Sequence, residues 1–329
     1  MHRRIRGLAL AVFVLALASL LPLAVPGSLN TAAAPKHIVI GFSTPGTDHG
    51  WLAAIQRFAR EEAQKLPNTT LIITDGQNNP SKQIGDVESL IARKVDVIVM
   101  LPADGKALTP VAAKVKAAGI PLINLDRRID SQDYYAYIGG DNYGIGYAAG
   151  EYIAQRLHGK GNVVEITGPA GISVTNDRSR GFADAIKRFP GIKVVASQPG
   201  DFLPDKGMKV MENILQAQRH IDAVYTHDDD MAMGVIQAIK SAHREKEMFV
   251  TGVGPLKRVM QMIQNGEPPF AATFDYSPIM SASAVKLAYL AATHKGMSDL
   301  AELEIPREIL LRASCITKDN VAQFMKIGF

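Results

Sequence analysis

The stretch His37-Ile38-Val39-Ile40-Gly41-Phe42 is a short apolar run of the length of a buried β-strand. A segment from about Trp51 to Lys65 follows, and its apolar residues recur at helical spacing on one face. Leu71-Ile72-Ile73 is a second short apolar run. A strand, a helix and a strand joined by short connections predict a parallel sheet with helices packed on its faces.

The same alternation continues to Pro121-Leu122-Ile123-Asn124-Leu125 and starts again after Gly139-Gly140. We therefore predict an α/β fold with two doubly wound parallel-sheet lobes and several crossings between them. The first lobe is expected to comprise residues 35–138 plus 277–306, and the second 139–276 plus 307–329. Residues 277–293 are expected to form a helix, and 303–311 to be extended.

The N-terminal 34 residues have the three-part plan of an export signal. Arg3, Arg4 and Arg6 precede an apolar run from Leu8 to Val25, and small residues follow at 31–34. We expect a cleaved signal peptide and a periplasmic protein. An uncleaved membrane anchor is the alternative, although Pro22 in the apolar run disfavours a straight spanning helix.

Composition excludes several classes of protein. The chain has 329 residues with 36 Lys plus Arg against 32 Asp plus Glu, a net charge of +4. Three of the basic residues lie in the export signal, and no basic run follows, so a nucleic-acid partner is not expected. The single cysteine, Cys315, excludes an intrachain disulfide framework and a cysteine zinc cluster. No cofactor is predicted.

The residues that follow the predicted strands point to the ligand. Ligands of parallel α/β sheets bind beside the carboxyl ends of the strands. Carboxylates, amides, arginines and aromatic rings gather there, as in Asp126-Arg127-Arg128, Gly200-Asp201-Phe202 and Thr226-His227-Asp228. Carboxylates accept hydrogen bonds from hydroxyl pairs, arginine donates in a fork, and rings pack on C–H faces. This mixture favours a neutral polyhydroxylated ligand.

Several of these stretches carry a resemblance to a known family. The chain over about residues 36–329 resembles the ribose-binding type of periplasmic sugar-binding protein of ABC importers, nearest its galactofuranose-binding branch. The matching stretches are Ile40-Gly41-Phe42-Ser43, Asp75-Gly76-Gln77-Asn78-Asn79-Pro80, Leu125-Asp126-Arg127, Gly139-Gly140-Asp141-Asn142, Asp177-Arg178, Gly181-Phe182, Gly200-Asp201-Phe202 and His227-Asp228-Asp229-Asp230-Met231.

The resemblance implies a type I periplasmic binding protein that captures a pentose or hexose by hinge closure, acts as a monomer and delivers its ligand to a membrane permease. It places ligand contacts at Ser43, Asp48, His49, Trp51, Asp126, Arg127, Arg178, Phe202, Asp228 and Tyr276. Asp126, Arg127, Arg178 and Asp228 would bind hydroxyls, and Trp51 and Phe202 would sandwich the ring. Asp228, Gly254, Leu101 and Tyr276 depart from the ribose binders, which argues against ribose itself.

Other interpretations are weaker. His227-Asp228-Asp229-Asp230 looks like a metal cluster, but adjacent side chains diverge, and we expect Asp228 at the ligand with Asp229 or Asp230 capping the next helix. Gly144-Ile145-Gly146-Tyr147-Ala148-Ala149 fits a dinucleotide fingerprint, but Asp141-Asn142 before it is better explained as a helix N-cap. We predict no catalytic residues. An exported sugar-processing enzyme remains open, as does a module presenting its sugar to a membrane receptor or sensor kinase.

Overall fold

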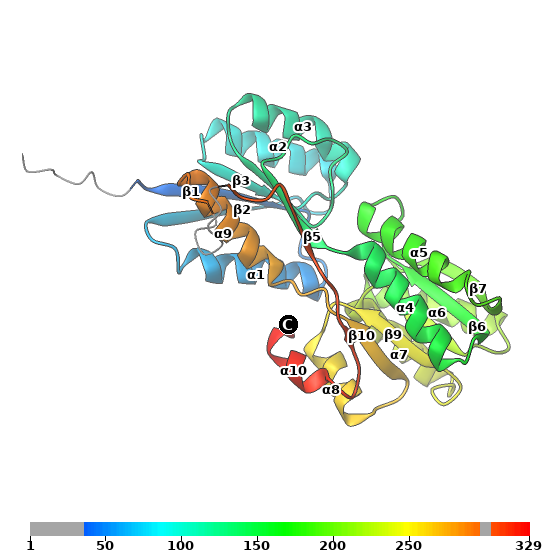
Figure 1. Cartoon of the computed structure of the whole chain (residues 1–329). Coiled ribbons are helices and arrows are strands. Elements are labelled where there is room, and N and C mark those ends of the chain that lie inside the picture. Colours follow the sequence, from blue (N-terminus) through cyan, green and yellow to red (C-terminus); the bar gives the residue numbers. More distant parts are fainter. Residues whose placement is uncertain (1–35, 297–303) are drawn as a thin grey trace, which may run out of the picture. The chain divides into compact units, whose positions relative to one another are not determined.

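Two six-stranded sheets are present in the part of the chain that the computed structural model describes, residues 36–296 and 304–329 (Figure 1). The first sheet consists of β1 (Ile38–Thr44), β2 (Thr69–Asp75), β3 (Val97–Met100), β4 (Leu122–Leu125), β5 (Ala136–Gly140) and β11 (Glu308–Leu311). Its order is β11-β5-β4-β3-β1-β2, and all neighbouring strands are parallel. The sequence of strands and helices confirms the predicted α/β class.

The second sheet repeats this plan. It consists of β6 (Lys160–Thr167), β7 (Gly191–Pro199), β8 (Ala223–Thr226), β9 (Phe249–Val253), β10 (Phe270–Phe274) and β12 (Cys315–Ile316). The order is β12-β10-β9-β8-β6-β7, and only the short β12 runs antiparallel to its neighbour. All residues of β3, β4 and β8 are buried, as expected for parallel strands covered on both faces.

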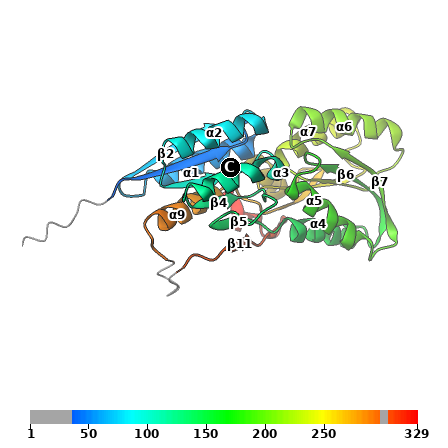
Figure 2. The ribbon, with the colours of Figure 1, turned by 90° about the horizontal axis from the view of Figure 1, so that it is seen from above.

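Helices cover both faces of each sheet. In the first lobe, α2 (Pro80–Ala92) pairs with α3 (Gly105–Ala117) on one face, and α1 (Gly50–Ala63) pairs with α9 (Met280–Ala292) on the other. In the second lobe, α4 (Asn142–Arg156) pairs with α5 (Ser173–Ile186), and α6 (Pro204–Ala217) pairs with α7 (Asp229–Ser241) across the sheet (Figure 2). The helices α8 (Lys257–Asn265) and α10 (Val321–Phe324) and the 3-10 turn η2 (Met325–Ile327) complete it.

Local sequence explains where several helices begin and end. Asn79 caps α2 by accepting from the N–H groups of Ser81 and Lys82, and Pro80 occupies the first helical position, where its missing N–H costs nothing. α3 ends at Ala117, and Gly119, two residues later, has a left-handed φ of 72°, which a glycine adopts without strain. Residues of this kind determine where the helices that follow the strands begin and end.

The chain crosses between the lobes three times, after β5, after β10 and after β11. One predicted boundary is wrong. Residues 307–329 were assigned to the second lobe, but Glu308–Leu311 pairs in parallel with β5 of the first sheet. The third crossing therefore comes after Leu311, and only the segment from Cys315 onward joins the second sheet. A four-residue strand has too weak a pattern for its sheet to be predicted from sequence.

The predicted signal peptide at residues 1–34 lies outside the described residues. Among the residues that the structure does describe, no helix combines the length and the apolar character needed to span a bilayer. Residues 37–329 form one unit, and the three crossings tie its two lobes together.

Candidate functional site

A pocket lies where the carboxyl ends of strands from both sheets meet. It is lined by His49, Trp51, Asp126, Arg127, Val174, Arg178, Phe202, Asp228, Val253, Gly254 and Tyr276. Eight of the ten residues predicted from the sequence therefore lie together.

The other two predicted residues lie elsewhere. The Ser43 side chain is fully buried beneath the pocket, and its hydroxyl accepts from Gln83 Nε2 at 3.1 Å. Asp48 lines a neighbouring outer pocket, which also includes Asn78 and Asp201. Its carboxylate bonds to His49 Nδ1 at 2.7 Å and accepts from Asn78 Nδ2 at 2.8 Å. Neither side chain lines the inner pocket. Ser43 bonds to Gln83, and Asp48 bonds to His49, which does line it.

A chain of hydrogen bonds joins the two lobes at the base of the pocket. The Tyr276 hydroxyl donates to Asp126 Oδ1 and accepts from Asn142 Nδ2. Asn142 Oδ1 in turn accepts from Arg178 Nε at 3.0 Å. The Arg178 guanidinium also lies over the Tyr276 ring, with Cζ 4.4 Å from the ring centroid. Two residues of the crossings, Asn142 and Tyr276, thus connect the first-lobe carboxylate to the second-lobe arginine.

Two buried arginines keep donors available for a ligand. Arg127 Nη1 donates to the carbonyl oxygens of Pro102 and Ala103, and Arg178 Nη1 donates to that of His227. Within residues 36–296 and 304–329, Arg127 Nε and Arg178 Nη2 have no hydrogen-bond partner. A buried donor without a partner costs free energy, so an oxygen acceptor in the pocket would be stabilised.

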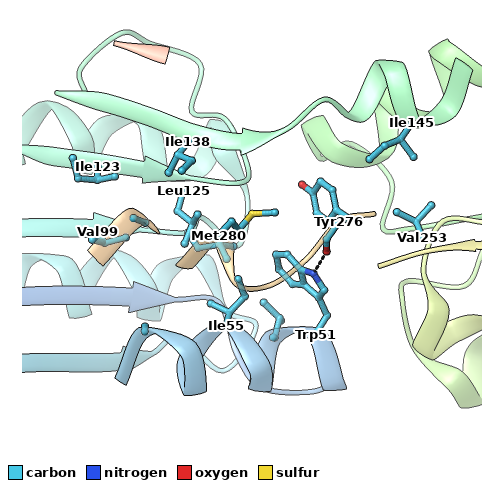
Figure 3. Packing of buried hydrophobic residues seen from close by; sticks show 14 of the residues in the cluster. Trp51, Ile55, Val99, Ile123, Leu125, Ile138, Ile145, Val253, Tyr276 and Met280 are labelled. Atoms are coloured by element: carbon cyan, nitrogen blue, oxygen red, sulfur yellow. Dashed lines mark hydrogen bonds between the residues drawn. The ribbon is translucent and has the colours of Figure 1, made fainter. Parts of the chain in front are cut away.

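Aromatic rings form two pairs along the pocket wall. Trp51 stacks on Tyr276 with ring centroids 5.6 Å apart, and its Nε1 donates to the Tyr276 carbonyl at 2.8 Å (Figure 3). Phe202 lies beside His49, with centroids 6.0 Å apart. Each of the two rings that are predicted to sandwich the ligand thus packs against a second ring, from the opposite lobe or from the hinge.

The three consecutive aspartates have three separate partners. Asp228 is the N-cap of α7 and accepts from the N–H of Met231 at 2.9 Å. Asp229 accepts from the Thr273 hydroxyl, and Asp230 accepts from the N–H of Trp51. The expectation that Asp229 or Asp230 would cap the helix is wrong, because Asp228 both caps it and lines the pocket. No group of metal-binding side chains occurs in the described part of the chain.

Burial shifts the acidity of the pocket groups. It raises the pKa of the Asp126 carboxyl, and the Arg127 guanidinium opposes this effect. Burial also raises the pKa of Asp228, as does the nearby Asp230 carboxylate. The pKa of Arg127 is lowered by burial, and that of the Tyr276 hydroxyl is raised well above its usual value. Burial thus disfavours the charged form of each of these groups.

The backbone is strained at the same place. Asp126 and Phe202 both have a left-handed φ of 64°, which is unfavourable for a side chain as large as phenylalanine. Each follows a strand of a different lobe and points its side chain into the pocket. Such strain persists where the surrounding structure holds it, and it concentrates at functional sites.

Sequence reasoning missed three groups of site residues. Val253 ends β9 and Gly254 follows it, so the rule that selects Asp126 covers both, although neither is among the predicted contacts. Val174 lies one helical turn before Arg178 on the same face of α5, a spacing that marks neighbours. Asn142 was treated only with the N-cap, which the structure confirms, since Asp141 accepts from the N–H of Gly144. Nothing in the sequence indicated its bonds to Tyr276 and Arg178.

The family is shown by comparison with known proteins. A family model described as "Periplasmic binding protein domain" matches residues 40–296. The chain belongs to this periplasmic binding protein family. Galactofuranose-binding protein YtfQ of Escherichia coli (strain K12) is 37% identical over 270 residues, which cover 79% of this chain and 84% of that protein.

Solved structures of other family members have the same fold. The crystal structure of a galactofuranose-binding protein superposes with a TM-score of 0.81 at 32% identity, covering 89% of this chain and 100% of that one. The fructose-binding periplasmic domain of a hybrid two-component system superposes with a TM-score of 0.79 at 32% identity, covering 88% and 94%. The predicted resemblance and the two-lobed architecture of the periplasmic binding proteins are thereby confirmed.

Proposed function

We propose that this periplasmic binding protein captures a monosaccharide, in furanose form, by closing its two lobes around it. The observation that carries the proposal is the inner pocket, lined by residues of both lobes, which combines buried arginine donors, buried carboxylates and aromatic rings. Neither lobe holds the whole set. A sugar that touches both halves therefore stabilises the closed state by its differential affinity for that state.

The pocket residues divide by chemistry. Asp126 and Asp228 would accept hydrogen bonds from ring hydroxyls, and the free donors of Arg127 and Arg178 would bind ring or hydroxyl oxygens. Trp51 and Phe202 would pack on the C–H faces. A sugar with a misplaced hydroxyl would leave one of these buried groups unpaired, which supplies the selectivity. The galactofuranose ligands of two relatives support a furanose.

The remaining parts of the proposal concern the cellular role. After export through the signal at residues 1–34, the protein would act as a periplasmic monomer and pass its sugar to the membrane permease of an ABC importer. We propose that it is not an enzyme. The relatives that it matches are binding proteins, which supports this part of the proposal.

Titration of the fluorescence of Trp51, the single tryptophan of the chain, tests the proposal. Residues 35–329 would be titrated with pentoses, hexoses, polyols and furanose-rich sugars, with thermal unfolding as an independent measure. We expect a saturable change for one sugar at micromolar or lower concentration, together with a raised midpoint of unfolding. If no member of the panel changes either signal, monosaccharide capture is wrong.

A sensory role is the second candidate, and the similarity to the fructose-binding domain of a two-component system favours it. Both roles require the same sugar-dependent closure. ATP hydrolysis by a reconstituted ABC importer separates the two roles. The sugar-loaded protein should stimulate hydrolysis if it serves the importer, and should leave it unchanged if its partner is a sensor kinase.

A further inference from the structure

The N-terminus of α1 lies at the cleft and is not capped by its own lobe. The N-cap residue His49 makes no side-chain capping bond among the described residues, and the first turn holds no acidic side chain. By contrast, α2, α3, α4 and α7 are each capped by the side chain of their own N-cap residue, namely Asn79, Asp104, Asp141 and Asp228. The first N–H groups of α1 therefore need acceptors from elsewhere.

The other lobe supplies the acceptor. The carboxylate of Asp230, in the first turn of α7, accepts from the N–H of Trp51 at 3.0 Å, and the N–H of Gly50 also bonds to it. A carboxylate at this place satisfies orphan donors and interacts favourably with the helix dipole. Asp230 itself does not line the sugar pocket. It thus makes a helix cap that exists only while the lobes are together.

Gly50 makes room for this contact. A Cβ at Gly50 would lie 2.8 Å from Asp230 Oδ1, closer than real Cβ atoms approach an oxygen. A larger residue at position 50 would require this carboxylate, the free end of a side chain, to shift. A glycine at this position therefore leaves space for the Asp230 carboxylate of the facing lobe.

We propose that Asp230 is a closure latch, a residue that sets the fraction of closed protein and so the affinity for the sugar without contacting the sugar. This inference rests on the proposed capture of a sugar by hinge closure. In the open protein, water would solvate both the helix end and the carboxylate, so the contact favours only closed states. Apparent affinity scales with the closed fraction, and the latch therefore raises the affinity for every ligand by one common factor.

The size of the factor follows from the nature of the contact. The free energy that an N-terminal cap contributes to a helix corresponds to about a five- to tenfold change in an equilibrium constant. We expect the same factor in the affinity for the sugar. A second bond crosses the cleft, from the N–H of Arg128 to Ser173 Oγ at 3.1 Å, and it remains when Asp230 is replaced. Loss of the latch should therefore weaken closure without abolishing it.

Affinity measurements on two variants test the latch. Asp230→Ala removes the carboxylate. Gly50→Ala keeps Asp230 but adds a methyl group that its carboxylate must avoid. Because alanine favours helix over glycine, Gly50→Ala should not lower the free energy of unfolding. Asp205→Ala is the matched control, since Asp205 is an exposed acid in the first turn of α6 in the same lobe.

We expect both latch variants to bind two different sugars about five- to tenfold more weakly, by the same factor for each sugar, with faster dissociation and unchanged control behaviour. A factor that differs between the sugars would show that Asp230 acts on the ligand, directly or through its neighbour Asp228, and would overturn the latch. Affinities within twofold of the unaltered protein for both variants would overturn it as well.

A ligand-free measurement keeps the test independent of the sugar. Spin labels at Lys106→Cys in the first lobe and Lys209→Cys in the second, in a Cys315→Ser background, report the interlobe distance. We expect the short-distance population to shrink in both latch variants but not in Asp205→Ala. If the unaltered protein binds no sugar in the panel, the proposed function fails, whereas an unchanged distance distribution in the latch variants overturns the latch.

Discussion

The two arginines of the pocket belong to different lobes and are held in different ways. Arg127 donates to the main-chain carbonyls of Pro102 and Ala103, which belong to its own lobe. Arg178 is held by Asn142, which follows the first crossing, and stacks on Tyr276, which lies in the second. Arg127 is therefore held within its own lobe, whereas Arg178, which also donates to the His227 carbonyl of its own lobe, depends in part on the hinge. Substitutions should affect the two halves unequally.

Arg178→Ala should have the largest effect. It removes a charged donor to the sugar, leaves the His227 carbonyl without its partner and releases Asn142 from the hinge network. We expect sugar affinity to fall about 100- to 1,000-fold, equivalent to ~3–4 kcal/mol. Arg127→Ala should lower sugar affinity about 10- to 100-fold, a smaller loss, because the other partners of Arg127 are main-chain carbonyls of its own lobe. Calorimetric titration of both variants measures the difference, and equal losses would contradict the asymmetry.

Tyr276→Phe tests the hinge side of the comparison. The substitution keeps the ring that stacks on Trp51 but removes the hydroxyl that donates to Asp126 and accepts from Asn142. The loss of one buried hydrogen-bonding group should weaken sugar binding about tenfold, or ~1.4 kcal/mol. The titration of Trp51 fluorescence measures it. An unchanged affinity would show that the network does not position Asp126 for the ligand.

The acidity of Asp228 gives a pH-dependent prediction. Burial and the Asp230 carboxylate raise the pKa of Asp228 from 3.8 to about 7. The folded protein then retains a proton that the unfolded chain releases above about pH 4, so the free energy of unfolding falls as pH rises from about 4 to 7. Asp228→Asn keeps a good N-cap and should reduce that fall by about 1–2 kcal/mol.

Urea denaturation at several pH values between 4 and 7.5 measures this slope. Asp205→Asn is the control, because an exposed carboxylate should leave the slope unchanged. If Asp228→Asn follows the same pH dependence as the unaltered protein, Asp228 is ionised in the folded state at neutral pH, and the pocket carries more negative charge than its burial implies.

Most of the pocket-lining residues could be predicted from the sequence, some from one rule and others, such as Trp51 and Arg178, from the family resemblance. Strand ends in a doubly wound sheet converge, so Asp126, Phe202 and Asp228 could be grouped from their positions alone. The rule identifies which residues reach the edge but not which way each side chain turns. Ser43 lies one residue before the end of β1, and its side chain points toward Gln83. Contacts across the cleft, such as that of Asp230 with Trp51, join residues too far apart in sequence for any local pattern to reveal.

Ser43→Ala should have the smallest effect on binding and sharpens the same comparison. Its hydroxyl is fully buried and accepts from Gln83 Nε2, which also donates to the Leu101 carbonyl at 2.8 Å. Removing it should lower the free energy of unfolding by ~1 kcal/mol, because the Gln83 amide loses one acceptor in a buried place. Sugar affinity should stay within about twofold, because no part of the ligand reaches a residue below the pocket floor. Parallel urea denaturation and calorimetric titration separate the two quantities. A tenfold loss of affinity with unchanged stability would place Ser43 in contact with the sugar, and the inner pocket would then extend deeper into the first lobe than its lining residues indicate.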